Sequence, residues 1–207
     1  MVLNYKGKSY IEKGDSTVKI SAEYFPIIET PRLRLRKITA EDANSILVYL
    51  SDEDVMKYYG LLPFTSVDDA LGEIAWYQSI QDHQTGMRWG ITLKEEDVII
   101  GSCGFHNGVA KHFRTEIGFE LSKAYWGKGI AAEAIKAVVS YGFDHMNINR
   151  IEALIEPANQ PSQKVVEKIG FIKEGLLRNY EYTNGKFDDL YIYSLLKRDI
   201  RTDSQSF

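Results

Sequence analysis

The most restrictive feature of this sequence is a glycine-containing turn between a strand pattern and a helix pattern. Residues 115–121 alternate like a half-buried strand, and apolar residues recur at helical spacing after Gly129. Gly127 and Gly129 let the backbone turn tightly and approach a ligand closely, because neither carries a Cβ. The first amides of the following helix have no partner within that helix and lie at the positive end of its dipole. Segment 126–132 therefore predicts an anion-binding turn.

Apolar periodicity divides the rest of the chain into strands and helices. Further strands are predicted at 32–36, 87–93, 98–105, 150–155, 171–177 and 190–196. Helices are predicted from Thr39, at 67–81, from Ile130, and between Pro161 and Gly170. In the second of these, the apolar residues Ala70, Leu71, Ile74 and Tyr77 stand at helical spacing. The charged segment 94–97 and the pair Asn184-Gly185 predict hairpin turns.

Composition along the chain sets the expected domain boundaries. Residues 1–28 are rich in Lys, Ser, Gly and Tyr and are expected to form an N-terminal extension, with one hairpin from 5–10 and 17–21. One domain is expected over 29–200, followed by a C-terminal tail at 201–207.

Charge and hydropathy exclude several classes of protein. The chain carries 25 Lys and Arg against 29 Asp and Glu, a net charge of −4, which argues against direct nucleic-acid binding. No run reaches the roughly 18 consecutive apolar residues of a membrane span, and the N-terminus lacks the apolar core of a signal peptide. We therefore expect a cytoplasmic protein with no membrane partner.

The placement of cysteine and histidine argues against thiol and metal chemistry. The one cysteine, Cys103, lies in an apolar strand pattern, and we interpret it as a small core residue that fits a reducing compartment. The 4 histidines are scattered without the spacing of metal ligands, so no metal site is expected.

The glycine turn is compatible with two further interpretations. Gly127, Gly129 and Ala132 satisfy the G-x-G-x-x-G/A dinucleotide fingerprint, with Glu152 about 20 residues further on. That fingerprint needs strand–helix–strand units and a tight turn, whereas hairpin-connected strands and a longer connector after Leu121 precede this one. The other interpretation is an ordinary helix start without a ligand.

The run Trp126-Gly127-Lys128-Gly129-Ile130-Ala131 resembles the pyrophosphate loop of the GNAT superfamily, the acetyl-CoA-dependent N-acetyltransferases. That loop is written Q/R-x-x-G-x-G/A, and Gly129 and Ala131 stand at its small-residue positions. Trp126 departs from the pattern, because it stands where Gln or Arg is usual. The contacts at this position are mainly those of the backbone.

Other stretches are similar to one branch of that superfamily, which acetylates N-terminal alanines of ribosomal proteins. Asn159-Gln160-Pro161-Ser162 and Glu167-Lys168-Ile169-Gly170-Phe171 resemble its N-x-x-S…EKxGF stretch. The runs 29–36, 175–178 and 184–190 also resemble that branch. The similarity therefore spans about residues 29–198.

The resemblance implies an α+β fold of GNAT type, with three α/β/α layers and a mixed, mostly antiparallel central sheet splayed between its middle strands. Acetyl-CoA would bind in the cleft as acetyl donor, its pyrophosphate on the glycine turn and its pantetheine arm along the preceding strand. The implied coenzyme-binding residues are Phe119, Leu121, Trp126, Gly127, Lys128, Gly129, Ile130, Ala131, Asn159 and Ser162.

Acetyl transfer to an amine needs a base for the amine and benefits from an acid for the leaving thiolate. The resemblance indicates Glu181 as the base, and we expect Ser162 to protonate the sulfur. Either residue could instead be structural, Glu181 as a solvated loop charge and Ser162 as a helix cap. Glu116 and Glu120, which share a strand face, are the alternative bases. The tyrosine acid of many relatives is replaced by Val166.

The expected acceptor is a primary amine, foremost the N-terminal α-amine of a ribosomal protein. An α-amine has a pKa near 7.7–8.0 and a lysine near 10.4, so neutralising the lysine costs about 3.4 kcal/mol more. Acetylation of a polyamine, amino acid or drug, and a non-catalytic acyl-CoA-binding module, are the alternatives. The acceptor would pass loops at 56–64, with Tyr180 and Tyr182 beside it. Exchange of the C-terminal hairpin would give a homodimer, and Asp188 and Asp189 are expected at the hairpin turn and strand start.

Overall fold

The order of strands in the sheet separates the first half of the chain from the second. The computed structural model describes residues 25–201, so the hairpin predicted at 5–10 and 17–21 and the last six tail residues, 202–207, lie outside the described part. The sheet order is β1-β2-β3-β4-β5-β6-β8-β7. The strands are β1 (Ile28–Glu29), β2 (Leu33–Arg36), β3 (Met87–Leu93), β4 (Gly101–Val109), β5 (Arg114–Leu121), β6 (Arg150–Ile155), β7 (Ile172–Thr183) and β8 (Lys186–Leu196).

Among the strands of residues 25–201, only β5 and β6 run parallel, and every other neighbouring pair is antiparallel. The parallel pair is joined at three positions, where residues 114–116 face 150–152, and the strands separate beyond Glu116. This confirms the predicted sheet, mixed and mostly antiparallel, with a splay inside it.

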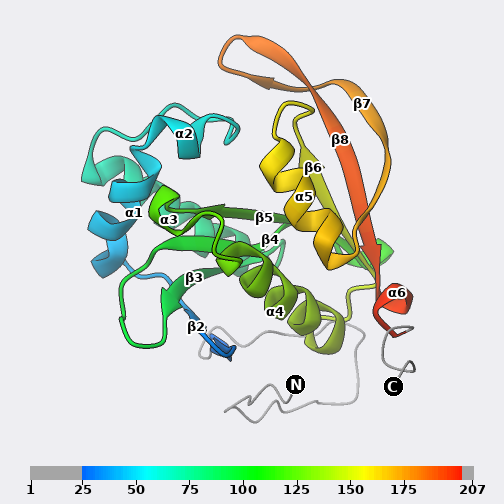
Figure 1. The fold of residues 1–207 in the computed structure, drawn as a ribbon, viewed down its shortest axis with the longest axis horizontal. Coiled ribbons are helices and arrows are strands. Elements are labelled where there is room, and N and C mark those ends of the chain that lie inside the picture. The colour runs from blue at the N-terminus through cyan, green and yellow to red at the C-terminus, as the bar shows by residue number, and fades with distance from the viewer. Residues whose placement is uncertain (1–24, 202–207) are drawn as a thin grey trace.

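Helices cover both faces of the sheet. They are α1 (Ala43–Leu50), α2 (Glu53–Met56), α3 (Val67–Asp82), α4 (Ile130–His145), α5 (Gln160–Ile169) and α6 (Lys197–Arg201), with short 3-10 turns at Ala40–Asp42, Lys123–Tyr125 and Ala110–His112. Figure 1 shows α4 and α5 next to each other on the face toward the viewer. They pack on a core that includes Trp89 and Phe105, whereas α1 and α3 enclose a second core around Tyr49 and Tyr77 on the opposite face.

The segment before β1 packs on the domain. Phe25 meets Trp89 edge to face, with ring centroids 5.4 Å apart. The indole N–H of Trp89 donates to the carbonyl of Pro26 at 2.8 Å. Ile28 has no exposed surface. The described part of the chain therefore contributes to the core from its first residues.

Most predicted elements are present at the expected places, because their apolar faces are periodic. Helix α3 begins where Ser66 and Asp69 cap each other's backbone amides. It buries Glu73 together with Ala70 and Tyr77, while Leu71 is 37% exposed. The strand expected from Val98 begins only at Gly101. Helix α2 was not predicted.

The last hairpin is longer than its sequence pattern indicates. Strand β7 ends at Thr183 and strand β8 begins at Lys186, on either side of the predicted turn at Asn184-Gly185. Asp188 and Asp189 therefore lie near the start of β8, which agrees with the predicted strand start and not with the predicted place at the turn. The outer half of the hairpin is mostly exposed, so no apolar alternation marks it. Figure 1 shows this hairpin projecting past the rest of the sheet.

Candidate active site

A cavity of about 490 Å³ lies where β5 and β6 separate. Its walls come from β5 with one residue each of β3 and β4 (Arg88 and His106), the end of β6 with the start of α5, helix α3, the loop at 58–61, and the β7–β8 hairpin. Four of the predicted site residues line it, namely Phe119, Asn159, Ser162 and Glu181. The alternative bases Glu116 and Glu120 line it as well.

The start of α5 borders the cavity through a capped helix turn. Asn159 is the N-cap, and its side-chain oxygen accepts from the backbone N–H of Ser162 at 3.3 Å. The hydroxyl of Tyr58 donates to the carbonyl of Ala158 at 3.3 Å, which joins the 58–61 loop to this turn. Asn159 thus has the capping role, and the predicted acid Ser162 follows it in the first turn.

The β5 wall contains a buried ion pair. The guanidinium of Arg88 contacts the carboxylate of Glu120, and its Nε donates to the hydroxyl of Ser102 at 2.6 Å. That hydroxyl donates in turn to Glu120. Arg88 and Glu120 are 5% and 6% exposed. Burial raises the pKa of Glu120, and Arg88 and Ser102 oppose that rise.

Gly118 makes room for this ion pair. A Cβ at Gly118 would lie 2.8 Å from Arg88 Nη1 and 3.2 Å from His106 Nε2. Any larger residue would therefore push the guanidinium away from the strand.

Helix α3 adds a second buried carboxylate to the same wall. Glu73 is 8% exposed and accepts a hydrogen bond from the hydroxyl of Tyr59 at 2.7 Å. The ring of Tyr77 lies under Arg88, with 5.3 Å from its centroid to the guanidinium carbon. Burial raises the pKa of Tyr59 and of Tyr77. Both hydroxyls therefore remain protonated donors at neutral pH.

Glu116 and His106 meet at the closed end of the cleft. Glu116 Oε2 accepts from Asn107 Nδ2 at 3.1 Å and lies 3.7 Å from His106 Nδ1. Burial raises the pKa of Glu116, and the Asn107 hydrogen bond opposes this. Burial, with Arg88 nearby, lowers the pKa of His106 to about 4, so the imidazole is neutral at pH 7.

The hairpin wall is more open. Glu181 is exposed and faces Asp188 across the hairpin. Lys186 at 2.6 Å and the hydroxyl of Thr183, also at 2.6 Å, bind the carboxylate of Asp188 and lower its pKa. A Cβ at Gly60 would lie 3.4 Å from the side-chain methyl of Thr183, so the 58–61 loop and the hairpin meet at the cavity.

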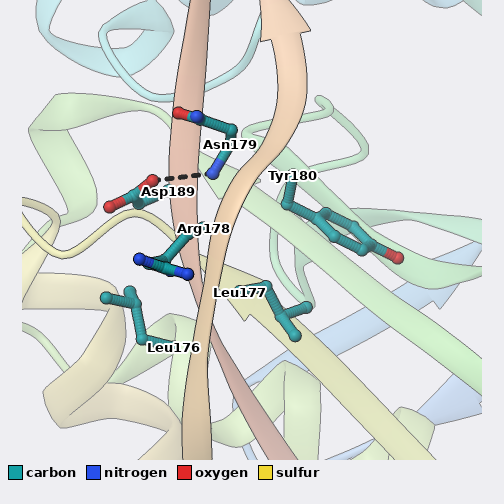
Figure 2. A pocket seen from close by; sticks show the side chains of 6 residues that line it. All are labelled: Leu176, Leu177, Arg178, Asn179, Tyr180 and Asp189. Atoms are coloured by element: carbon teal, nitrogen blue, oxygen red, sulfur yellow. Dashed lines mark hydrogen bonds between the residues drawn. The ribbon is translucent and has the colours of Figure 1, made fainter.

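A bulge in β7 precedes Glu181. Leu177 faces Leu190 and Glu181 faces Asp188, so residues 178–180 stand opposite Asp189 alone. Asn179, with φ 50°, donates its backbone N–H to Asp189 Oδ1 at 2.8 Å (Figure 2).

An open depression of about 650 Å³ lies at this bulge. Figure 2 shows Tyr180 pointing to the side of β7 opposite Asp189. Tyr180 borders this depression, and neither it nor Tyr182 is among the residues that line the cavity.

The predicted coenzyme turn follows β5 after a short connector that contains the 3-10 turn Lys123–Tyr125. Gly127 and Gly129 both have φ 74°, a left-handed conformation that explains why glycine stands at each position. Gly129 is the N-cap of α4, and within residues 25–201 no side chain caps this end and no atom lies within 4 Å of a Cβ at Gly127. The turn therefore leaves the first amides of a 16-residue helix accessible.

The end of β5 offers peptide groups to the open side of the cleft. Ser122 donates its N–H to the carbonyl of Ile100, the residue before β4, at 2.8 Å. Since bonding alternates along an antiparallel pair, Phe119 and Leu121 direct their peptide groups away from β4. The Leu121 carbonyl accepts from the Trp126 indole N–H at 2.7 Å. Trp126, which stands where the family pattern has Gln or Arg, thus links the two ends of the connector through this hydrogen bond.

The remaining candidates have structural surroundings. Cys103 is fully buried, and burial raises the pKa of its thiol to about 12, as expected of a core residue. Val166 is fully buried too. No three histidine, cysteine or acidic side chains in residues 25–201 are grouped to hold a metal ion. Over that same range, no helix has the length and apolar character needed to cross a membrane.

Sequence reasoning missed the residues that surround Glu120, namely Glu73 of α3, Arg88 of β3 and Ser102 of β4. Glu73 stands at helical spacing between Ala70 and Tyr77, so the period of α3 could have assigned it to the buried face. Arg88 interrupts an apolar strand, which was a second signal. Glu120 was an alternative base by its strand face, but Arg88 lies 14 residues from Ser102 and 32 from Glu120, and no local pattern identifies that pairing.

Comparison with known proteins agrees with this geometry. The profile described as "Acetyltransferase (GNAT) domain" matches residues 32–172. The Bacillus licheniformis "Uncharacterized N-acetyltransferase p20" is 44% identical over 170 residues, 82% of this chain and 96% of that protein. The Bacillus subtilis "Uncharacterized N-acetyltransferase YoaA" is 42% identical, over 84% of this chain and 98% of that protein. A solved GNAT-family acetyltransferase from Bacillus anthracis is 32% identical with a TM-score of 0.74, covering 83% of this chain and 99% of that one. The chain thus belongs to the GNAT family of acetyl-CoA-dependent N-acetyltransferases.

Proposed function

We propose that this acetyltransferase acts on the N-terminal α-amine of a protein, with ribosomal proteins as the first acceptors to test. The main support for this proposal is the cavity where β5 and β6 separate. Glu181, Ser162 and Asn159 line it together with residues of β5, the strand before the glycine turn. Cytoplasmic location belongs to the same proposal.

The glycine turn fits the diphosphate of acetyl-CoA. Its left-handed glycines leave open space at Gly127, and the α4 N-terminus has no side-chain cap. Residues 126–131 would hold the diphosphate through peptide N–H groups, and Phe119, Leu121 and Asn159 would bind the pantetheine arm. Bound there, acetyl-CoA supplies the thioester that the amine attacks.

Glu181 is proposed as the base that removes the proton from the amine. Among the described residues its carboxylate has no hydrogen-bond or ion-pair partner, so it is free to accept a proton. Ser162 is proposed to donate a proton to the departing sulfur. Glu116 is the alternative base, since its raised pKa brings it nearer to that of an α-amine.

The lining of the cavity suits a cationic acceptor. Glu73, Glu116, Glu156 and Glu181 have no Lys or Arg within ion-pair distance among the described residues. A protonated N-terminus approaching this field is attracted before it is deprotonated. A small polyamine would be attracted by the same charges and is the second candidate acceptor.

Two relatives support the protein acceptor. The Bacillus subtilis "Putative ribosomal N-acetyltransferase YdaF" is 37% identical over 101 residues, 49% of this chain. The Escherichia coli "Ribosomal-protein-serine acetyltransferase" is 29% identical over 112 residues.

Release of CoA thiol from acetyl-CoA tests the proposal with a panel of amines. The panel contains peptides with ribosomal-protein N-termini, the same peptides with blocked N-termini and an internal lysine, and spermidine. Turnover of free N-termini alone supports the proposal. Turnover of spermidine alone would replace it with the small-amine function, and coenzyme binding without turnover would indicate a non-catalytic module.

A further inference from the structure

The segment before β2 contacts the glycine turn although it is distant in sequence. Arg32, just before β2, donates from Nη1 to the carbonyl of Lys128 at 2.8 Å. Its Nη2 lies 3.5 Å from the Cβ position of Gly129. The guanidinium therefore contacts the turn itself, across 96 residues of sequence.

Glu133 fixes the position of this guanidinium. Its Oε2 accepts from Arg32 Nε at 2.6 Å, and its Oε1 accepts from the Arg32 backbone N–H at 3.0 Å and from the Thr30 hydroxyl at 2.5 Å. Burial raises the pKa of Glu133, but the hydrogen bonds from Thr30 and Arg32 outweigh it, and the net shift is downward. Glu133 thus stays ionised and its side chain stays oriented in the first turns of α4.

The contact with Lys128 has a consequence for the next amide. In a trans peptide unit the carbonyl and the N–H point in opposite directions, and the described residues contain no cis peptide. Because Arg32 holds the Lys128 carbonyl, the N–H of Gly129 points away from Arg32. No described residue accepts a hydrogen bond from it.

We propose that Arg32 is a positioning residue for coenzyme binding. It turns the Lys128 carbonyl away from the bound diphosphate and thereby directs the Gly129 N–H toward it. Without this anchor the glycine turn can rotate its peptide and present a carbonyl oxygen to the anion. The inference rests on the proposed use of the turn by acetyl-CoA.

Donors with and without the diphosphate test this role. We expect Arg32→Gln to raise KM for acetyl-CoA by roughly tenfold, the scale of one lost hydrogen bond to a charged group. The value of kcat and the kcat/KM for S-acetylpantetheine, which lacks the diphosphate, should not change. Arg34→Gln is the matched control, because Arg34 is an exposed arginine two residues further along with no side-chain bond among the described residues.

The outcomes separate the inference from the proposed function. An unchanged KM for acetyl-CoA, or equal losses with both donors, overturns the role of Arg32. A wild-type enzyme that uses both donors equally well overturns the diphosphate site itself. If Arg32→Gln does not fold, Arg32→Lys replaces it. A lysine can keep the pair with Glu133 without also reaching Lys128, so the same rise in KM is expected and an unchanged KM overturns the proposal.

Discussion

The two walls of the cavity hold their carboxylates in opposite ways. The strand wall (Glu73, Arg88, His106 and Glu120) is buried or partly buried, and its two carboxylates have fixed donors. The hairpin wall (Glu181 and Thr183) stands on a projecting hairpin, and Glu181 is exposed with no partner among the described residues.

This difference separates structural acids from a candidate catalytic acid or base. A carboxylate bound to a guanidinium stays ionised and has few lone pairs left for a substrate proton. A carboxylate without donors can accept a proton and release it again. The comparison therefore favours Glu181 over Glu120 as the base, although both line one cavity.

The largest effect is expected from breaking the strand wall. Arg88→Met should lower the free energy of unfolding by about 3–5 kcal/mol, because it leaves the buried carboxylate of Glu120 without its cation. Urea denaturation followed by circular dichroism measures this. The double variant Arg88→Met with Glu120→Gln is the control and should recover much of the loss. Equal losses in the single and double variants would mean that packing, not charge pairing, determines this wall.

On the hairpin wall the expected effect is on rate. Glu181→Gln should lower kcat by about 100-fold, the lower end of what a positioned base contributes. Its unfolding free energy should change by less than about 0.5 kcal/mol, since the side chain is exposed. Thiol release under saturating acetyl-CoA measures kcat, with Glu41→Gln on the exposed surface as control. A larger loss in Glu116→Gln than in Glu181→Gln would move the base to the closed end of the cleft.

The contrast between the walls also explains what the sequence could predict. Residues identified by local signals, such as the glycines of the turn, Asn159 before Pro161, and the hairpin turn at Asn184-Gly185, are found in the expected local structures. These signals depend on backbone conformation, which a few neighbouring residues determine.

The strand wall depends on contacts across the sheet, which no window of sequence contains. Arg88 meets Ser102 and Glu120 only because β3, β4 and β5 align in a particular register. Burial of Tyr59 against Glu73 likewise requires the loop after α2 to fold over α3. The extra length of β7 and β8 was missed for a similar reason, since backbone pairing extends them without an apolar pattern.

Lower pH should weaken the strand wall through His106. Its pKa is about 4 in the folded protein against an ordinary 6.5, so between these values the unfolded chain binds the extra proton. Stability from this group is therefore complete above pH 6.5 and declines as the pH falls toward 4. Between pH 7 and pH 5 the loss should be about 2 kcal/mol.

Comparison with His106→Gln isolates this contribution. Glu116, whose pKa burial raises, acts in the opposite direction in both proteins and cancels in the difference. The unfolding free energy of the variant should fall about 2 kcal/mol less than that of the wild type over this interval. If the unfolding free energies of the two proteins changed equally with pH, the pKa of His106 would be the same in the folded and unfolded states, and the prediction would be wrong.

The smallest effect is expected at the bulge that carries the hairpin wall. Asp189→Ala removes the acceptor for the Asn179 N–H and should lower the unfolding free energy by about 1 kcal/mol. Asp189→Asn retains a side-chain oxygen and is the matched control. In an unbroken ladder Asn179 would face Asp188, and the bulge places Glu181 there instead. Loosening the bulge should therefore raise KM for the amine, while KM for acetyl-CoA stays constant. A change in both KM values would mean that the hairpin also supports the coenzyme side, and the two walls would not be independent.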